Sequence, residues 1–143
     1  MNPTVLITDY VWPSIDAEKR ILKEINANIL IAPTSDESTL IKMATKADAI
    51  ITCFAQVTDK VILSAKNCKI ISRYGVGVDN IDIEEATSKG IIVMNIPDGN
   101  TISAAEHTIA MMMTLSRNIH AGHVGLLSGE WNRKQLVGSE LRG

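Results

Sequence analysis

The sequence predicts an α/β fold built on a parallel sheet with helices on both of its faces. Five short apolar runs recur along the first two thirds of the chain, and segments of helical pattern separate them. The runs are apolar at consecutive positions, which is typical of strands in a sheet that is covered on both faces. A regular alternation of strand and helix favours right-handed crossovers between parallel strands.

The apolar runs define five predicted strands, at 5–7, 29–31, 49–51, 70–71 and 91–93. Helical patterns follow the first four strands, at 15–27, 36–46, 58–66 and 82–89. Ser35 or Asp36 is the expected N-cap of the second helix. The third helix is expected to begin at Thr58 or Asp59. Gly90 stands where a glycine ends the fourth helix.

A long helix is predicted from about Ser103 to Asn118. Ser103 and Glu106 have the spacing of a capping box at its start. Residues 109–113 are apolar in every direction around the helix, so we expect more than one of its sides to be covered. A further helical stretch with several glycines follows, and the last residues look like the lead-in to another unit.

Composition excludes several classes of protein. The chain has 143 residues, the usual size of one domain, with 45% hydrophobic residues, 21% charged residues and a formal charge of −2. These values disfavour a disordered chain and a polybasic binder of nucleic acid or membranes. The sequence predicts a soluble, cytoplasmic protein, because it has only two cysteines, an N-terminus without a signal-peptide pattern and no long apolar run.

A glycine-containing turn over residues 75–80 is the first candidate site, because it follows a predicted strand. Its pattern is G-x-G-x-x-N, and Asp98 lies about 20 residues further on, as in a dinucleotide fingerprint. We reject that interpretation, because Asn80 replaces the third glycine and the next helix starts late. What remains is a turn whose backbone N–H groups can approach an anion, or an ordinary strand-to-helix connection.

Arg73 directly precedes this turn and offers a bidentate fork to a carboxylate or a phosphate, although it can also be an ordinary surface arginine. The three histidines have no cysteine or carboxylate at a ligand spacing, so no metal site is predicted; they are His107, His120 and His123. Cys53 and Cys68 are expected to be two small buried hydrophobic residues.

Three motifs in order resemble the D-isomer-specific 2-hydroxyacid dehydrogenases: IISRYGVGVDNID (70–82), ATSKGIIVMN (86–95) and NTISAAEH (100–107). The resemblance implies a flavodoxin-like substrate domain over residues 1–100, with a doubly wound five-stranded parallel sheet. It also implies that residues 101–143 contain a long interdomain helix, at 101–119, and lead into a Rossmann domain that binds NAD. In the family the fingerprint of that domain begins beyond the position of Gly143, so the Rossmann domain is expected to be absent from this chain.

The resemblance also implies roles for individual residues. Arg73 matches an arginine that faces the anionic end of the substrate, and Val76 and Gly77 match a loop whose backbone amides hold the substrate carboxylate. Val76 is in addition expected to lie near the nicotinamide of NAD, and Asn100 near the cleft. The family's catalytic arginine, glutamate and histidine belong to the later domain. No catalytic residue is therefore expected in this chain, which alone should be inactive.

The implied partner is a small anionic 2-hydroxy or 2-oxo acid that resembles 3-phosphoglycerate. Many phosphoglycerate-type members have an arginine where this chain has Thr52, so glycerate or a hydroxypyruvate-like compound is an alternative substrate. The family is expected to form homo-oligomers, and the chain alone to self-associate through helix 101–119.

Two alternatives belong to other functional classes. One is a regulatory module of the receiver type, which needs an aspartate at the end of the third strand. The chain has Asp9 after the first strand but Thr52, Cys53 and Phe54 at the end of the third, so this pattern is weak. The other is a non-catalytic NAD-sensing protein of dehydrogenase ancestry.

Overall fold

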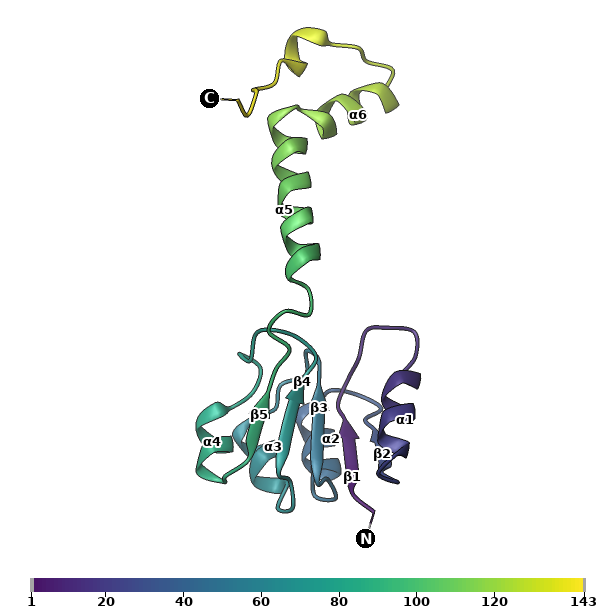
Figure 1. Ribbon diagram of the computed structural model, residues 1–143. Helices are drawn as coiled ribbons and strands as arrows, with labels where there is room; N and C mark the ends of the chain where they lie inside the picture. The colour runs from purple at the N-terminus through teal and green to yellow at the C-terminus, as the bar shows by residue number, and fades with distance from the viewer. Residues whose placement is uncertain (1, 143) are drawn as a thin grey trace. The chain divides into compact units, whose positions relative to one another are not determined.

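A computed structural model describes residues 2–142 of the chain. Its sheet contains five strands that are all parallel, in the order β2-β1-β3-β4-β5 (Figure 1). They are β1 (Thr4–Ile7), β2 (Asn28–Ile31), β3 (Ala49–Thr52), β4 (Ile70–Arg73) and β5 (Ile92–Met94). The predicted doubly wound parallel sheet of the flavodoxin-like fold is therefore confirmed. The chain divides into two compact units, the first ending at Gly99 and the second beginning at Asn100.

Four helices connect the strands of the first unit: α1 (Asp16–Lys23), α2 (Glu37–Ala44), α3 (Asp59–Ser64) and α4 (Ile83–Ser88). Asp36 is the N-cap of α2 and accepts the Thr39 N–H at 3.0 Å, as predicted. Thr58 is the N-cap of α3, but its hydroxyl donates to Glu37 at 2.7 Å instead of capping the helix. Gly90 follows α4 with a left-handed φ of 69°, which glycine adopts without strain.

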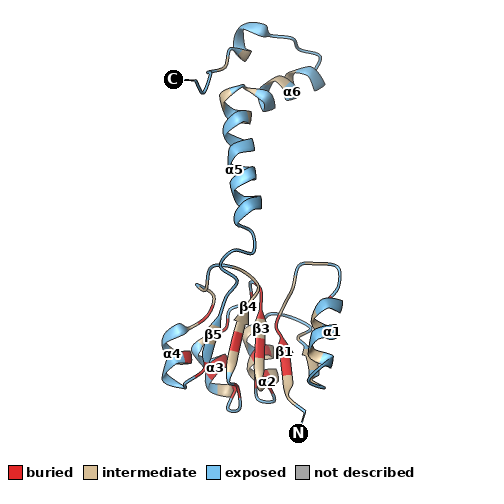
Figure 2. Cartoon of the chain, in the orientation of Figure 1, coloured by how far each residue is buried: buried red, intermediate tan, exposed pale blue. Residues whose placement is uncertain are grey.

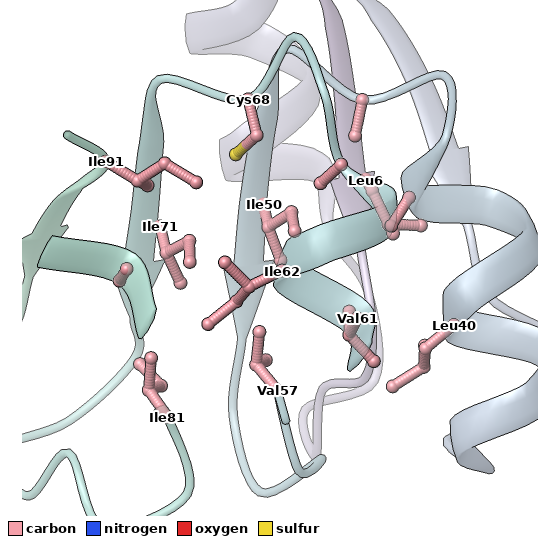
Figure 3. Packing of buried hydrophobic residues seen from close by; sticks show 14 of the residues in the cluster. Leu6, Leu40, Ile50, Val57, Val61, Ile62, Cys68, Ile71, Ile81 and Ile91 are labelled. Carbon is pink, nitrogen blue, oxygen red and sulfur yellow. The ribbon is translucent and has the colours of Figure 1, made fainter. Parts of the chain in front are cut away.

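The hydrophobic core lies between the sheet and the helices α2, α3 and α4. Alternate residues of the strands point into it, among them Leu6, Ile50 and Ile71, which are fully buried (Figure 3). Helix residues that complete the core are Leu40, Ala44, Val61, Ile62 and Ala86. This one cluster holds the sheet and three helices together, so it fixes the positions of the loops at the ends of the strands.

The opposite face of the sheet is only partly covered, which corrects the expectation that both faces are buried. Helix α1 contributes Leu22 and Ile25 to a groove of about 1110 Å³ on this side, which Ile51 and Ile70 also line. On this face of edge strand β5, Ile92 and Met94 are 61% and 51% exposed, whereas Val93 packs against the core on the other face. The sequence did not indicate this partial cover, because an apolar run does not show how many helices lie on each face of the sheet.

The second unit contains α5 (Thr101–Ser116), α6 (Ile119–Leu127) and a 3₁₀ turn (Arg133–Leu136). The predicted capping box is wrong, because α5 already begins at Thr101, and the Asn100 carbonyl accepts the Ala104 N–H at 2.9 Å. Ser103 and Glu106 therefore lie inside the helix. No residue of α5 or α6 is buried, in contrast to strands β1, β3 and β4, which all hold buried residues (Figure 2).

Candidate functional site

The candidate site lies at the carboxyl edge of three neighbouring strands. Asp9 follows β1, the segment 53–55 follows β3, and Arg73 ends β4. Since β1, β3 and β4 are adjacent and parallel, their carboxyl ends meet at the same edge of the sheet. Residues far apart in the sequence are therefore brought together here.

Asp9 binds the segment after β3 through its carboxylate. The backbone N–H groups of Cys53, Phe54 and Ala55 donate to it at 2.9, 2.7 and 3.2 Å, and the Thr8 hydroxyl donates at 2.8 Å. Burial raises the pKa of Asp9, but these hydrogen bonds together outweigh burial and leave the pKa below its ordinary value. Asp9 is thus an ionised group that fixes the 53–55 segment.

The guanidinium of Arg73 is held by its neighbours. Its Nε–H donates to the Cys53 carbonyl at 3.1 Å, and its Cζ lies 5.8 Å from the centroid of the Phe54 ring. The group also lies against Gly75, where a Cβ atom would come within 2.8 Å of Cζ. Among the described residues, no acceptor binds its terminal nitrogens. The fork is therefore available to an anion.

The turn after β4 presents unpaired backbone N–H groups. The carbonyls of Gly75 and Val76 accept from the Ile96 N–H at 3.0 Å and from the Asn95 side chain at 2.7 Å. In residues 2–142 the N–H groups of Val76 and Gly77 have no acceptor, and both residues are exposed. Because a hydrogen-bonded turn with free N–H groups binds anions, the turn can hold a carboxylate.

The two glycines of the turn leave room for neighbouring side chains and do not adopt a left-handed backbone. Neither is among the residues with positive φ. At Gly75 a side chain would meet Arg73, and at Gly77 a Cβ would lie 3.1 Å from a carboxylate oxygen of Asp79. The sequence pattern located this turn correctly, but it did not indicate which neighbours the glycines accommodate.

The pyrophosphate of a dinucleotide does not fit at this turn. After it, Ile81 pairs with Val57, and helix α4 starts only at Ile83. The N-terminus of α4 is occupied by Asp82, whose carboxylate accepts the Glu85 N–H at 2.8 Å. The helix amides that would bind a phosphate are therefore already capped by a negative charge, in agreement with our rejection of a fingerprint.

The loop after β1 adds an aromatic contact behind the turn. Trp12 packs edge-on against Tyr74, with 4.6 Å between the ring centroids and an angle of 85° between their planes. Burial and the nearby carboxylate of Glu18 raise the pKa of the Tyr74 phenol well above its usual range. No sequence motif indicates this contact, because the order of the strands is what brings the two rings together.

Arg73, Val76 and Gly77 are brought together by the structure in one short segment at the sheet edge. Asn100 belongs to the second unit, where it is the N-cap of α5 without a capping side-chain hydrogen bond. The three histidines also belong to the second unit; they are His107, His120 and His123.

Within residues 2–142, no group of three or more histidine, cysteine, aspartate or glutamate side chains could hold a metal ion. Cys53 and Cys68 are free and buried, as predicted. In the described part of the chain, no helix has the length and apolarity needed to cross a membrane.

Comparison with known families gives one match over nearly the whole chain. The family model described as D-isomer specific 2-hydroxyacid dehydrogenase, catalytic domain, matches residues 5–136. A D-3-phosphoglycerate dehydrogenase of Synechocystis is 44% identical over 122 residues, which are 85% of this chain and 22% of the relative. One of Archaeoglobus fulgidus is 50% identical over 107 residues, 75% of this chain and 18% of the relative. The chain thus spans about a fifth of the length of these relatives.

Solved structures of this kind are similar as well. The NAD⁺-bound 3-phosphoglycerate dehydrogenase of Entamoeba histolytica matches with a TM-score of 0.73 and 27% identity, over 82% of this chain and 40% of that one. The NAD-dependent formate dehydrogenase of Staphylococcus aureus, in complex with NAD, matches with a TM-score of 0.79 and 28% identity, over 94% and 44% of the two chains.

Proposed function

The chain belongs to the D-isomer-specific 2-hydroxyacid dehydrogenases, and on that premise we propose that its first unit is the substrate-binding portion of an NAD-dependent oxidoreductase. The whole enzyme interconverts a D-2-hydroxy acid and its 2-oxo acid by hydride transfer. One observation carries the proposal for this portion: the unpaired N–H groups of Val76 and Gly77 lie on an exposed turn that begins beside the fixed guanidinium of Arg73.

Each group has a role that follows from its chemistry. The N–H groups of Val76 and Gly77 bind the carboxylate of the substrate, and Arg73 pairs with an anionic group through its terminal nitrogens. NAD, when bound, takes up or supplies the hydride. Because its pyrophosphate does not fit at this turn, NAD would be held mainly by residues elsewhere, and Val76, whose side chain is exposed, would contribute to its binding. The contribution of this unit is to orient the substrate.

The substrate we favour is 3-phosphoglycerate, since relatives at 44% and 50% identity are D-3-phosphoglycerate dehydrogenases and Arg73 offers a fork to a phosphate. Glycerate or a hydroxypyruvate-like compound is the second candidate, and one observation supports it. Thr52 is fully buried and its hydroxyl donates to the Ala55 carbonyl at 3.2 Å, so this position adds no group for a phosphate.

The test is Arg73→Ala in the full-length protein, with steady-state kinetics on 3-phosphoglycerate and on glycerate. Loss of a hydrogen-bonded charged partner should weaken substrate binding by about 1.5–3 kcal/mol, seen as a higher KM. Arg20→Ala, which removes an exposed arginine from α1, is the matched control and should leave KM unchanged. An unchanged KM for every acid would remove Arg73 from the site.

Comparison of the two acids in the same experiment identifies the substrate. If Arg73 binds the phosphate, Arg73→Ala should raise the KM for 3-phosphoglycerate much more than that for glycerate. Equal effects on both acids would mean that Arg73 contacts the carboxylate that they share. That outcome would remove the support that Arg73 gives to a phosphorylated substrate.

The second unit has a proposed role in the same enzyme. We assign α5 to the helix that leads from the substrate domain toward an NAD-binding Rossmann domain, and Asn100, its N-cap, to the residues that bind the substrate. Its apolar surface supports this role, because Ile109, Met111 and Met112 are all more than half exposed. We also propose that the enzyme is a homo-oligomer.

A further inference from the structure

The orientation of Arg73 depends on two residues that no motif singled out for that role. Its guanidinium has an acceptor on one side, the Cys53 carbonyl, and a glycine on another, Gly75. The peptide that supplies this carbonyl is itself fixed at both ends of Cys53, because its own N–H, that of Phe54, donates to Asp9 and so does the N–H of Cys53. A chain of direct contacts therefore runs from Asp9 through Cys53 to Arg73.

We propose that Asp9 and Gly75 are positioning residues that set the direction in which Arg73 presents its terminal nitrogens to the substrate. This inference rests on the proposed function, in which Arg73 binds an anionic group. Neither residue needs to touch the substrate. They act on affinity through Arg73 alone.

Asp9 acts through the backbone after β3. Its carboxylate receives three consecutive N–H groups, those of residues 53–55, so the peptide planes of this segment have one preferred arrangement. That arrangement aims the Cys53 carbonyl at Nε of Arg73 and places the Phe54 ring beside the guanidinium. Loss of the charge on Asp9 would free the segment and, with it, both contacts to Arg73.

Gly75 acts by having no side chain, which leaves room for the guanidinium of Arg73. The guanidinium lies where a side chain at position 75 would begin, and a Cβ there would come within 2.8 Å of Cζ. The atoms that would be displaced belong to the end of a flexible side chain, so the backbone can stay in place. Alanine at this position should therefore move Arg73 without unfolding the sheet.

The strand pairing beneath these contacts does not depend on Asp9. The Tyr74 N–H donates to the Thr52 carbonyl at 2.9 Å, and β3 pairs with β4 in register up to Thr52 and Arg73. The core residues below this edge are held by helices α2 to α4. We therefore expect variants at both positions to fold, with changes confined to the edge.

The experiment compares Asp9→Asn and Gly75→Ala, each in the wild-type and in the Arg73→Ala background of the full-length protein. KM and kcat are measured for the preferred 2-hydroxy acid. Each variant should raise KM about three- to tenfold, the effect of one ordinary hydrogen bond, with little change in kcat. In the Arg73→Ala background the same substitutions should have no further effect, since double-mutant cycles isolate such coupling.

Asp36→Asn is the matched control, because the Asp36 carboxylate also accepts a backbone N–H, that of Thr39, but caps α2. It should leave KM unchanged. Raised KM values that persist in the Arg73→Ala background would overturn the proposal, because the residues would then act without Arg73. Should Asp9→Asn fail to fold, Gly75→Ala still decides between these outcomes.

The proposal and the proposed function fail in different ways. A higher KM for Arg73→Ala together with unchanged values for Asp9→Asn and Gly75→Ala overturns the positioning role alone. An unchanged KM for Arg73→Ala overturns the site itself, and the positioning role with it.

Discussion

At the scale of single residues, Asp9 is the charged group that fixes the backbone of the candidate site. It receives hydrogen bonds from three backbone amides and from Thr8, and these keep its pKa below the ordinary value of 3.8 in spite of partial burial. A carboxylate used in this way stabilises the folded chain only while it is ionised. Stability should therefore depend on pH through this residue.

We predict that Asp9→Asn lowers the free energy of unfolding at neutral pH, and that the difference from wild type shrinks in acid. The folded pKa lies below the unfolded value of 3.8. The stabilisation is therefore complete above about pH 4 to 5 and is lost as the pH falls through the folded pKa. Urea unfolding followed by circular dichroism over this range measures it.

Asp98→Asn, at an exposed turn, is the control for a general effect of removing a carboxylate. A difference between wild type and Asp9→Asn that stays constant down to strongly acidic pH would show that the charge is not responsible. In that case the shape of the Asp9 side chain would be the important property.

At this scale, part of the candidate site could be predicted from the sequence. Arg73, Val76 and Gly77 could be proposed because they are consecutive or nearly so and match one motif. The contacts of Asp9 could not, because its partners lie 44 to 46 residues away and meet it only through the order of the strands. The same is true of Trp12 and Tyr74.

At the scale of elements, each predicted strand is observed within about two residues, because a short apolar run has few ways to be buried. The prediction that helices cover both faces of the sheet was less successful. The runs at 70–71 and 91–93 suggested cover on both faces, but no helix of the first unit other than α1 contributes to the groove on the second face. The run at 91–93 consequently holds a buried residue, Ile91, directly before an exposed one, Ile92.

Two isoleucines of the sheet should respond very differently to truncation. Ile50 on β3 is fully buried in the core, so Ile50→Ala should lower the free energy of unfolding by about 2–5 kcal/mol. Ile92 on β5 is mostly exposed, and Ile92→Ala should change it by less than about 0.5 kcal/mol. Urea unfolding of both variants measures the difference, and equal effects would contradict the described packing.

Helix α5 exposes a band of large apolar side chains that should drive self-association of the 143-residue chain. Ile109 and Met112 are 61% and 51% exposed. Light scattering at micromolar concentration should show species larger than a monomer, and Met112→Lys should reduce them. A monodisperse monomer, with α5 protected from proteases, would contradict this prediction.

At the scale of the whole molecule, the described chain contains a substrate-type domain fold but no site for the dinucleotide at its glycine turn. Alternation of strands and helices was enough to predict the fold class, because few topologies satisfy it. The fold class does not identify the family, because the same fold carries many functions. The family was predicted from three motifs in a fixed order.

We predict that this 143-residue chain alone does not oxidise NADH in the presence of hydroxypyruvate. The proposed site supplies groups that hold a substrate, and the resemblance assigns the acid and base to another domain. The absorbance of the reduced nicotinamide measures the reaction, and the full-length protein is the positive control. Appreciable turnover by the chain alone would show that catalytic groups lie within it.

The edge-on packing of Trp12 on Tyr74 gives the molecule an optical probe. The chain has two tryptophans, and the other, Trp131, lies in the second unit. After Trp131→Phe, all indole emission would come from a ring that touches the residue directly before Gly75. Binding of a 2-hydroxy acid at the turn could then be followed by the fluorescence of Trp12, without a label and without any turnover.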